Sequence, residues 1–158
     1  MKLFPPNAGI SLLRGMMILI KENGGSIEVS KLADESEQNV DNLLPLIEAS
    51  KMLGLVNVDE GEIKLTPEGK RMDMHNFLEI LSKKIKGIEP FKSSLEMLAN
   101  SNGTASTDEL THALLANGIM LHGDFKMNKV LLKSMLLKWA VRTNLLEYKE
   151  DEDAWTLK

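Results

Sequence analysis

The residues of this chain that could bind a metal are few and poorly grouped. Its three histidines, His75, His112 and His122, fall in different predicted elements. Only Glu109 and His112 have a spacing that puts two metal ligands on one helix face, and no second pair accompanies them. Cysteine is absent, which excludes thiolate ligands, disulfides and thiol nucleophiles. We therefore predict no metal site, and we expect the histidines to face solvent.

Motifs for catalysis or nucleotide binding are also missing. Gly24-Gly25 is followed by Ser-Ile-Glu and not by Gly-Lys-Ser or Gly-Lys-Thr, and the sequence contains no Gly-x-Gly. No serine lies in a Gly-x-Ser-x-Gly elbow, and the carboxylates are scattered over predicted surfaces. The sequence therefore predicts a protein that is not an enzyme, with no catalytic residue and no bound cofactor.

One group of basic residues is spaced so that it could contact nucleic acid. Lys126, Lys129 and Lys133 stand at i, i+3 and i+7 and so line one helix face, and Arg142 could join them on DNA phosphates. The whole chain, however, has a net charge of −4. Residues 1–72 hold 8 basic and 11 acidic residues, and residues 73–158 hold 11 and 12. DNA binding is therefore possible but disfavoured.

Two stretches ninety residues apart, Leu55 to Leu65 and Leu145 to Leu157, share a pattern of apolar alternation, an acidic turn and further alternation. This pattern predicts a β-hairpin in each. Gly54 and Asn144 stand just before the hairpins and are residue types that readily adopt the left-handed conformation that ends a helix. A helix that feeds a hairpin is typical of a winged-helix unit. We predict a mainly α fold with small β-hairpins (α+β), built of tandem winged-helix units; two unrelated helix–hairpin corners are the alternative.

The other elements follow from periodicity and breakers. In the first unit we expect helices over 8–21 and 29–34, a strand over 26–28, and a third helix that ends at Leu53 and either begins near Asp41 or bends at Pro45. In the second we expect helices over 91–99, 107–116 and 125–141, with Thr107 and Asp124 as caps. Thr66 and Pro67 start a long helix that runs to about Ile85.

This organisation predicts three segments: winged-helix unit one over 1–72, a bridging helix and linker over 73–90, and winged-helix unit two over 91–158. The apolar run from Ile10 to Ile20 is interrupted by Arg14 and is too short to span a bilayer, so we expect no membrane insertion. It also lacks a cleavage site, and we expect a cytoplasmic protein.

The chemistry of the hairpins argues against the usual use of a winged helix, which reads DNA with its third helix and a basic wing. The wing tips are Asp59-Glu60-Gly61-Glu62 and Glu150-Asp151-Glu152-Asp153, and we interpret the second as a solvated tip. The helix over 125–141 is apolar nearly all the way round beyond Lys129, which predicts burial on every side. That burial favours a helix packed between units or subunits over one lying in a DNA groove.

These features favour a protein-binding role. The candidate interaction residues are large apolar and aromatic side chains near the second hairpin, and plain core packing is the alternative for each. They are Leu132, Met135, Leu136, Trp139 and Tyr148. Ten methionines are many for 158 residues; they are interpreted as core fillers, with a Met-rich docking groove as the alternative.

Three stretches resemble a known family, the AAA-associated C-terminal domain: residues 42–54 (NLLPLIEASKMLG), 62–69 (EIKLTPEG) and 139–148 (WAVRTNLLEY). The family is found behind the ATPase of nitrate, sulfonate and taurine type ABC importers and also in stand-alone archaeal proteins. The third stretch departs from it at Ala140-Val141 and Thr143-Asn144, where the family tends to show a glycine and an Arg-Tyr pair. The motifs are structural, and they identify the family better than an activity.

The resemblance implies a regulatory or interaction role near a transport ATPase. We therefore expect a non-enzymatic module whose partner is a second copy of itself, as a homodimer, or an ABC-type ATPase subunit in trans. The alternative is a DNA-binding transcriptional regulator that uses the second winged-helix unit.

Overall fold

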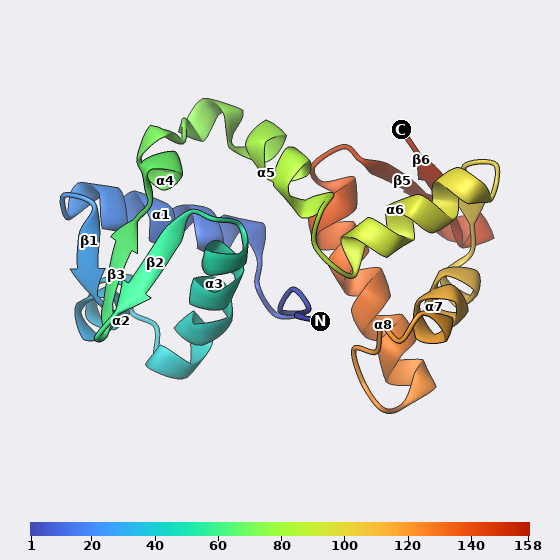
Figure 1. Ribbon diagram of the computed structural model, residues 1–158, viewed down its shortest axis with the longest axis horizontal. Helices are drawn as coiled ribbons and strands as arrows, with labels where there is room; N and C mark the ends of the chain where they lie inside the picture. Colours follow the sequence, from blue (N-terminus) through green and yellow to red (C-terminus); the bar gives the residue numbers. More distant parts are fainter. The chain divides into compact units, whose positions relative to one another are not determined.

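The computed structural model describes residues 1–158, and the chain divides into two compact units. The N-terminal unit is Asn7–Phe77, and the C-terminal unit combines Met1–Pro6 with Leu78–Lys158. Both units run through the same order of elements, helix, strand, helix, helix, strand, strand (Figure 1). The repeat predicted from the two hairpins therefore extends to three helices and three strands in each unit.

The N-terminal unit carries its hairpin on three helices. Its elements are α1 (Ile10–Glu22), β1 (Ser26–Glu28), α2 (Val29–Ser36), α3 (Val40–Met52), β2 (Val56–Asp59), β3 (Glu62–Leu65), α4 (Pro67–Arg71) and the 3₁₀ turn η1 (Met74–Asn76). The sheet has the order β1-β3-β2 and is antiparallel throughout. Glu60 and Gly61 form the two-residue turn with φ of 49° and 79°, the left-handed pair that a tight hairpin requires.

The C-terminal unit repeats this plan. Its elements are α5 (Phe77–Ile85), α6 (Phe91–Asn100), β4 (Thr104–Ala105), α7 (Thr107–Ala116), α8 (Phe125–Met135), the π-helical turn η2 (Leu136–Val141), β5 (Leu146–Lys149), the 3₁₀ turn η3 (Glu150–Glu152) and β6 (Ala154–Leu157). Its sheet, β4-β6-β5, has the same antiparallel order as the first.

The corner between the third helix and the hairpin is built alike in both units. Gly54 and Asn144 both adopt the predicted left-handed conformation, with φ of 73° and 67°. The next residue of each closes the helix by donating its backbone N–H to a carbonyl five residues earlier. These bonds join Leu55 N to Ser50 O and Leu145 N to Ala140 O, both at 2.9 Å. This is the closure expected of a left-handed helix cap, and it sets the direction of each hairpin.

Two expected helices differ from the structure. The single helix predicted from Pro67 to Ile85 is wrong: Met72 and Asp73 are extended, and α4, η1 and α5 take its place. The Asp73 carboxylate accepts from the His75 backbone N–H (2.9 Å), a local bond that competes with helix continuation. The helix predicted over 125–141 is α-helical only to Met135, after which η2 widens. Pro45 is tolerated inside α3, which begins at Val40.

The predicted caps are right in two cases and shifted in one. Thr66 caps α4 and Asp124 caps α8, each by accepting a backbone N–H. The cap of α7 is Ser106 and not Thr107. Ser106 and Glu109 form a reciprocal capping box, which frees the Thr107 hydroxyl for other partners.

Each unit has its own apolar core. In the N-terminal unit the core gathers Leu13, Met17, Ile20, Leu32, Leu43 and Ile63, each at most 2% exposed. In the C-terminal unit Phe4 lies edge-on to Phe91 and to Trp139, with ring centroids 5.4 and 4.6 Å apart. The N-terminal segment is tied to this core through the Phe4 backbone N–H, which donates to the Glu89 carbonyl (2.8 Å). No helix is both long and apolar enough to cross a bilayer.

Gly69 explains one of the sequence stretches, EIKLTPEG. A Cβ at this position would overlap the backbone carbonyl oxygen of Leu55, so only glycine lets α4 pack onto the helix–hairpin corner. Thr66 holds the same contact, since its hydroxyl donates to the Gly54 carbonyl (2.7 Å). Gly15, inside α1, is the opposite case, because a Cβ there would meet nothing within 4 Å.

These two helical glycines give a matched pair of substitutions. We expect Gly69→Ala to destabilise the chain by about 1–3 kcal/mol, because backbone must move to relieve the overlap. Gly15→Ala should stabilise it by up to about 1 kcal/mol, since alanine favours helix over glycine. Urea denaturation followed by circular dichroism measures both; equal effects of the two variants would contradict the packing role of Gly69.

Candidate interaction face on α8

The residues expected to contact a partner are mostly inside the C-terminal unit. Leu132, Met135, Leu136 and Trp139 are at most 1% exposed, so none of the four is presented at the surface. Tyr148 is half-buried, and its ring lies against that of Trp155 with centroids 4.1 Å apart. The arc of α8 and η2 that carries the first four residues is therefore core.

The opposite arc of the same helix is exposed and apolar. Met127, Val130 and Leu137 are 39%, 57% and 38% exposed, although burial on every side was predicted. That prediction was wrong because a helix lying on a single unit can bury only the arc that faces the core. The spacing i, i+3, i+10 aligns the three with the half-buried Ser134 as one stripe, which we call the α8 stripe.

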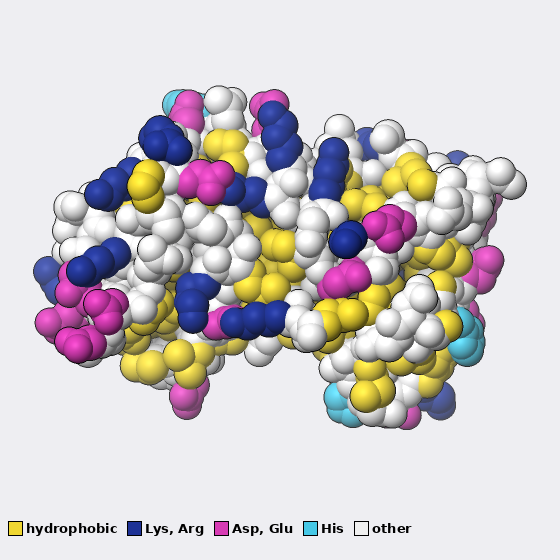
Figure 2. Space-filling model, in the orientation of Figure 1, with side chains coloured by type: hydrophobic (Ala, Val, Ile, Leu, Met, Phe, Trp, Pro, Cys, Tyr) yellow, Lys and Arg dark blue, Asp and Glu magenta, His cyan; other side chains and the backbone are white.

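The loop before α8 adds to the exposed apolar surface, since Met120 is 57% exposed. On the face of the C-terminal unit drawn in Figure 2, hydrophobic side chains gather where the 117–124 loop leads into α8. An exposed patch of this kind on a folded unit is typical of a protein-interaction site.

The three lysines of the predicted basic row flank the α8 stripe on one side. Lys129 Nζ lies 2.7 Å from Asp108 Oδ1 on α7, and this hydrogen bond raises the pKa of Lys129. Lys133 Nζ lies over the Tyr148 ring, 5.2 Å from its centroid. Lys126 and Arg142 are exposed, and Arg142 follows the end of η2. The lysines thus share one flank, but two of them are already engaged by neighbouring elements.

The second hairpin is anchored by a carboxylate. Asp153 Oδ1 accepts from the Thr107 hydroxyl (2.6 Å) and from the Tyr148 hydroxyl (2.7 Å), and Oδ2 accepts from the Thr107 backbone N–H (3.3 Å). Trp155 Nε1–H donates to the Thr107 oxygen (2.8 Å), so the indole joins the same network. Asp153 is therefore part of the fold, whereas a solvated tip was predicted for it. Glu150, Asp151 and Glu152 are exposed as expected.

These bonds shift the titration of Asp153. Burial alone would raise the pKa of this carboxyl, but the hydrogen bonds from Thr107 and Tyr148 outweigh burial, with help from the charge of Lys129, and the pKa is lowered. In the N-terminal unit the corresponding contact between the hairpin and the second helix needs no side chain, because the Val29 backbone N–H donates to the Gly61 carbonyl (2.9 Å). In the C-terminal unit the carboxylate thus replaces a backbone acceptor.

The π-helical turn sets where α8 leaves the core. Within it Trp139 is fully buried, and the carbonyl of Trp139 accepts from both the backbone N–H (3.1 Å) and the hydroxyl (2.6 Å) of Thr143. Single π turns inside helices are rare overall, but those that occur are often found at functional sites. Here the turn keeps Trp139 against Phe4 while Leu137 stays exposed.

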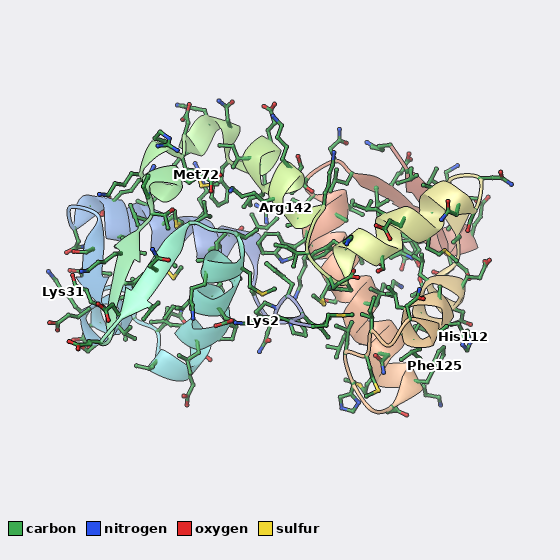
Figure 3. All side chains as sticks on the ribbon, viewed as in Figure 1. Lys2, Lys31, Met72, His112, Phe125 and Arg142 are labelled. Carbon is green, nitrogen blue, oxygen red and sulfur yellow. The ribbon has the colours of Figure 1, made fainter.

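The histidines and the Glu109–His112 pair form no cluster. The Glu109 carboxylate accepts from the Ser106 backbone N–H (3.1 Å) in the capping box. His112 stacks on Phe125 with ring centroids 4.6 Å apart, and the two lie side by side in Figure 3. No group of three or more metal-binding side chains is present. Glu109 therefore serves in a helix cap, and His112 in a contact between α7 and α8.

The N-terminal unit has a separate apolar hollow of about 410 Å³ between α1, α2 and α3. Its lining includes Leu12, Gly15, Met16, Leu19, Leu32 and Leu46. On α3, Val40 and Leu44 are 42% and 53% exposed, so this helix also presents apolar side chains outward. Unlike α8, α3 also carries carboxylates, at Asp41 and Glu48.

Sequence reasoning placed its candidate interaction residues on the arc of α8 that is buried, although a signal for the exposed arc was present. The lysines must face solvent, and Val130 and Leu137 lie within a few tens of degrees of Lys126 and Lys133 on a helical wheel. The lysine row therefore marks the exposed arc, and the apolar residues beside it are the exposed ones.

The elements thus form two small helix–hairpin units, each of which exposes apolar side chains on its third helix. The chain belongs to the C-terminal AAA-associated domain family, whose sequence profile matches residues 30–149. This match confirms the family expected from the three stretches, and it places the protein among domains associated with ATPases. A comparison with curated proteins found no match.

The carboxylate anchor gives a test of the C-terminal unit. Because the folded pKa of Asp153 lies below its unfolded value of about 3.9, its stabilisation is complete above that value and is lost as pH falls through the folded pKa. We expect Asp153→Asn to cost about 1–3 kcal/mol at pH 7 and much less in acid.

Urea denaturation at several pH values measures this difference. Asp151→Asn is the matched control, since it removes an exposed carboxylate from the same hairpin. A pH-independent cost of Asp153→Asn, or an equal cost of Asp151→Asn, would show that the carboxylate does not anchor the hairpin.

Proposed function

We propose that this protein is a non-enzymatic regulatory module of tandem winged-helix type that binds an ABC-type ATPase subunit through the exposed face of α8. The winged-helix assignment rests on the element order and on the β1-β3-β2 and β4-β6-β5 sheets, in which the hairpin after the third helix forms the wing. The link to an ATPase rests on the family, and a cytoplasmic location follows from such a partner.

The single observation that carries the proposal is the α8 stripe. Met127, Val130 and Leu137 keep much of their apolar surface in water on a helix whose other arc is fully packed. Covering such side chains at the centre of an interface contributes about 1 kcal/mol or more each. The third helix of a winged helix is also the element that most often contacts a partner, and here its outward face is apolar at the centre.

The surroundings of α8 support a binding role over a catalytic one. The carboxylates beside the stripe hold other groups: Asp108 pairs with Lys129, and Asp153 accepts from Thr107 and Tyr148. The Thr107 hydroxyl is itself a donor to Asp153 and an acceptor from Trp155. These groups act on each other as structural contacts, which supports a module without catalytic residues or cofactors.

Binding of the ATPase is tested with a matched pair of valine variants. We expect the tagged full-length chain to retain a purified ABC-type ATPase subunit from the same cytoplasm. Val130→Asp should weaken this binding at least about tenfold, because it places a charge in the centre of the stripe. Val40→Asp is the control, since Val40 is an exposed valine on α3, the corresponding helix of the other unit. Retention that survives Val130→Asp would refute the α8 face.

DNA binding by the C-terminal unit is the second candidate function, and the lysine row favours it. Lys126, Lys129, Lys133 and Arg142 would contact phosphates, but Lys129 is paired with Asp108 and the wing tip beside them is acidic. We expect no binding to mixed-sequence duplex DNA at micromolar protein and low salt, measured by fluorescence anisotropy. A salt-dependent affinity that falls in Lys126→Ala/Lys133→Ala would instead establish this function.

A homodimer is the other form of the protein-binding proposal. Its support is the presence of an exposed apolar stripe on each copy of α8. Analytical ultracentrifugation across concentration tests the homodimer. A dimer that is lost in Val130→Asp would identify a second copy as the partner, whereas a strict monomer would leave the ATPase subunit as the proposed partner.

A further inference from the structure

The flanks of the α8 stripe differ in chemistry from its centre. From Phe125 to Val141 the chain contains four lysines and no aspartate or glutamate. Lys126, Lys129 and Lys133 follow one flank, and Lys138 is exposed on the other side of the stripe. The outward face of α8 is thus an apolar strip about 15 Å long with cations along its edges.

Two of these lysines are held in place before any partner arrives. Lys129 is fixed by the 2.7 Å contact with Asp108, and Lys133 by the Tyr148 ring, which the anchored wing positions. A partner that contacts this flank therefore meets side chains with part of their conformational freedom already lost. Asp108 offsets one charge, which leaves Lys126, Lys133 and Lys138 as the surplus cations along α8 and η2.

A second copy of the chain does not complement this face. If two α8 helices pack antiparallel about a two-fold axis, their lysine rows fall on the same side of the interface. If they pack parallel, each row faces the flank that holds Lys138. Because α8 carries no carboxylate, both arrangements bring only cations together. The face also differs from a DNA-binding surface, since its centre is apolar where a phosphate or base edge would lie.

We propose that the α8 face binds an acidic amphipathic helix of a partner protein. Apolar side chains of that helix, spaced i, i+3 or i+4 and i+7, cover Met127, Val130 and Leu137, while a row of aspartates or glutamates along its edge pairs with Lys126 and Lys133. This inference rests on the proposed function and adds to it the chemistry of the segment by which an ATPase subunit is recognised.

Charge-matched synthetic helices test the proposal on the full-length chain. One peptide of about 18 residues carries a leucine stripe edged by glutamates, and its twin has lysines at the glutamate positions. Fluorescence anisotropy with labelled peptide measures binding. We expect the acidic peptide to bind with an affinity that falls as salt rises, and the basic twin to bind at least about tenfold more weakly.

Two pairs of variants place the binding on α8. Val130→Asp should abolish binding of the acidic peptide, and Val40→Asp should leave it unchanged. Lys126→Glu/Lys133→Glu should reverse the preference toward the basic twin. Lys83→Glu/Lys86→Glu changes the net charge of the same unit equally, at exposed lysines outside α8, and should not reverse it.

Each other outcome overturns the inference. No binding of the acidic peptide up to about 100 μM, equal binding of both peptides, or retention in Val130→Asp removes the acidic helix as the ligand. Displacement of the peptide by duplex DNA would show that the α8 face binds nucleic acid. Loss of peptide binding when the protein dimerises would show that a second copy of the chain occupies the face. If the peptide test fails, the effect of Val130→Asp on retention of the ATPase subunit still tests the proposed function. The two proposals can therefore fail separately.

Discussion

The left-handed corner after the third helix is the constraint on which each unit depends. At Gly54 and Asn144 the chain leaves a helix and turns into a hairpin within one residue, which requires a positive φ. The backbone bonds that close the corner, Leu55 N to Ser50 O and Leu145 N to Ala140 O, leave no freedom in how the hairpin departs. The hairpin then pairs with the short strand after the first helix, and this pairing holds the three helices around one core. Gly69 adds a further contact at the first corner, where α4 packs onto the Leu55 carbonyl.

The two units differ where the hairpin meets the second helix of the repeat. In the N-terminal unit a backbone carbonyl, that of Gly61, accepts from Val29 N. In the C-terminal unit the Asp153 carboxylate takes that place and also binds Thr107 and Tyr148 through their hydroxyls. The side-chain anchor fixes Tyr148, and through Tyr148 and Lys133 it reaches the exposed face of α8. A bond within the fold thereby helps to order the surface that we propose as the binding face.

The helix α8 has two roles on opposite arcs. Its inner arc, continued by the π-helical turn, packs Trp139 against the ring of Phe4, which the N-terminal segment supplies. Its outer arc keeps Val130 and Leu137 in water beside lysines. The apolar centre of this arc is the reason that we propose a protein segment, and not DNA, as its ligand. The family, a domain associated with ATPases, agrees with that proposal.

The sequence by itself determined the repeat, the hairpins, the left-handed corners and the family, because these depend on local properties: alternation, turn residues and short motifs. It also marked the acidic wings and the lysine row. The lysine row hinted at the exposed arc of α8, but only the tertiary structure decided which apolar residues are buried, since the core that covers them is built from distant segments such as the one that carries Phe4. It likewise decided that the Asp153 carboxylate is hydrogen-bonded within the fold, because the Thr107 hydroxyl that holds it lies 46 residues away in the chain. Long-range packing therefore determined the candidate site, whereas local chemistry determined the fold.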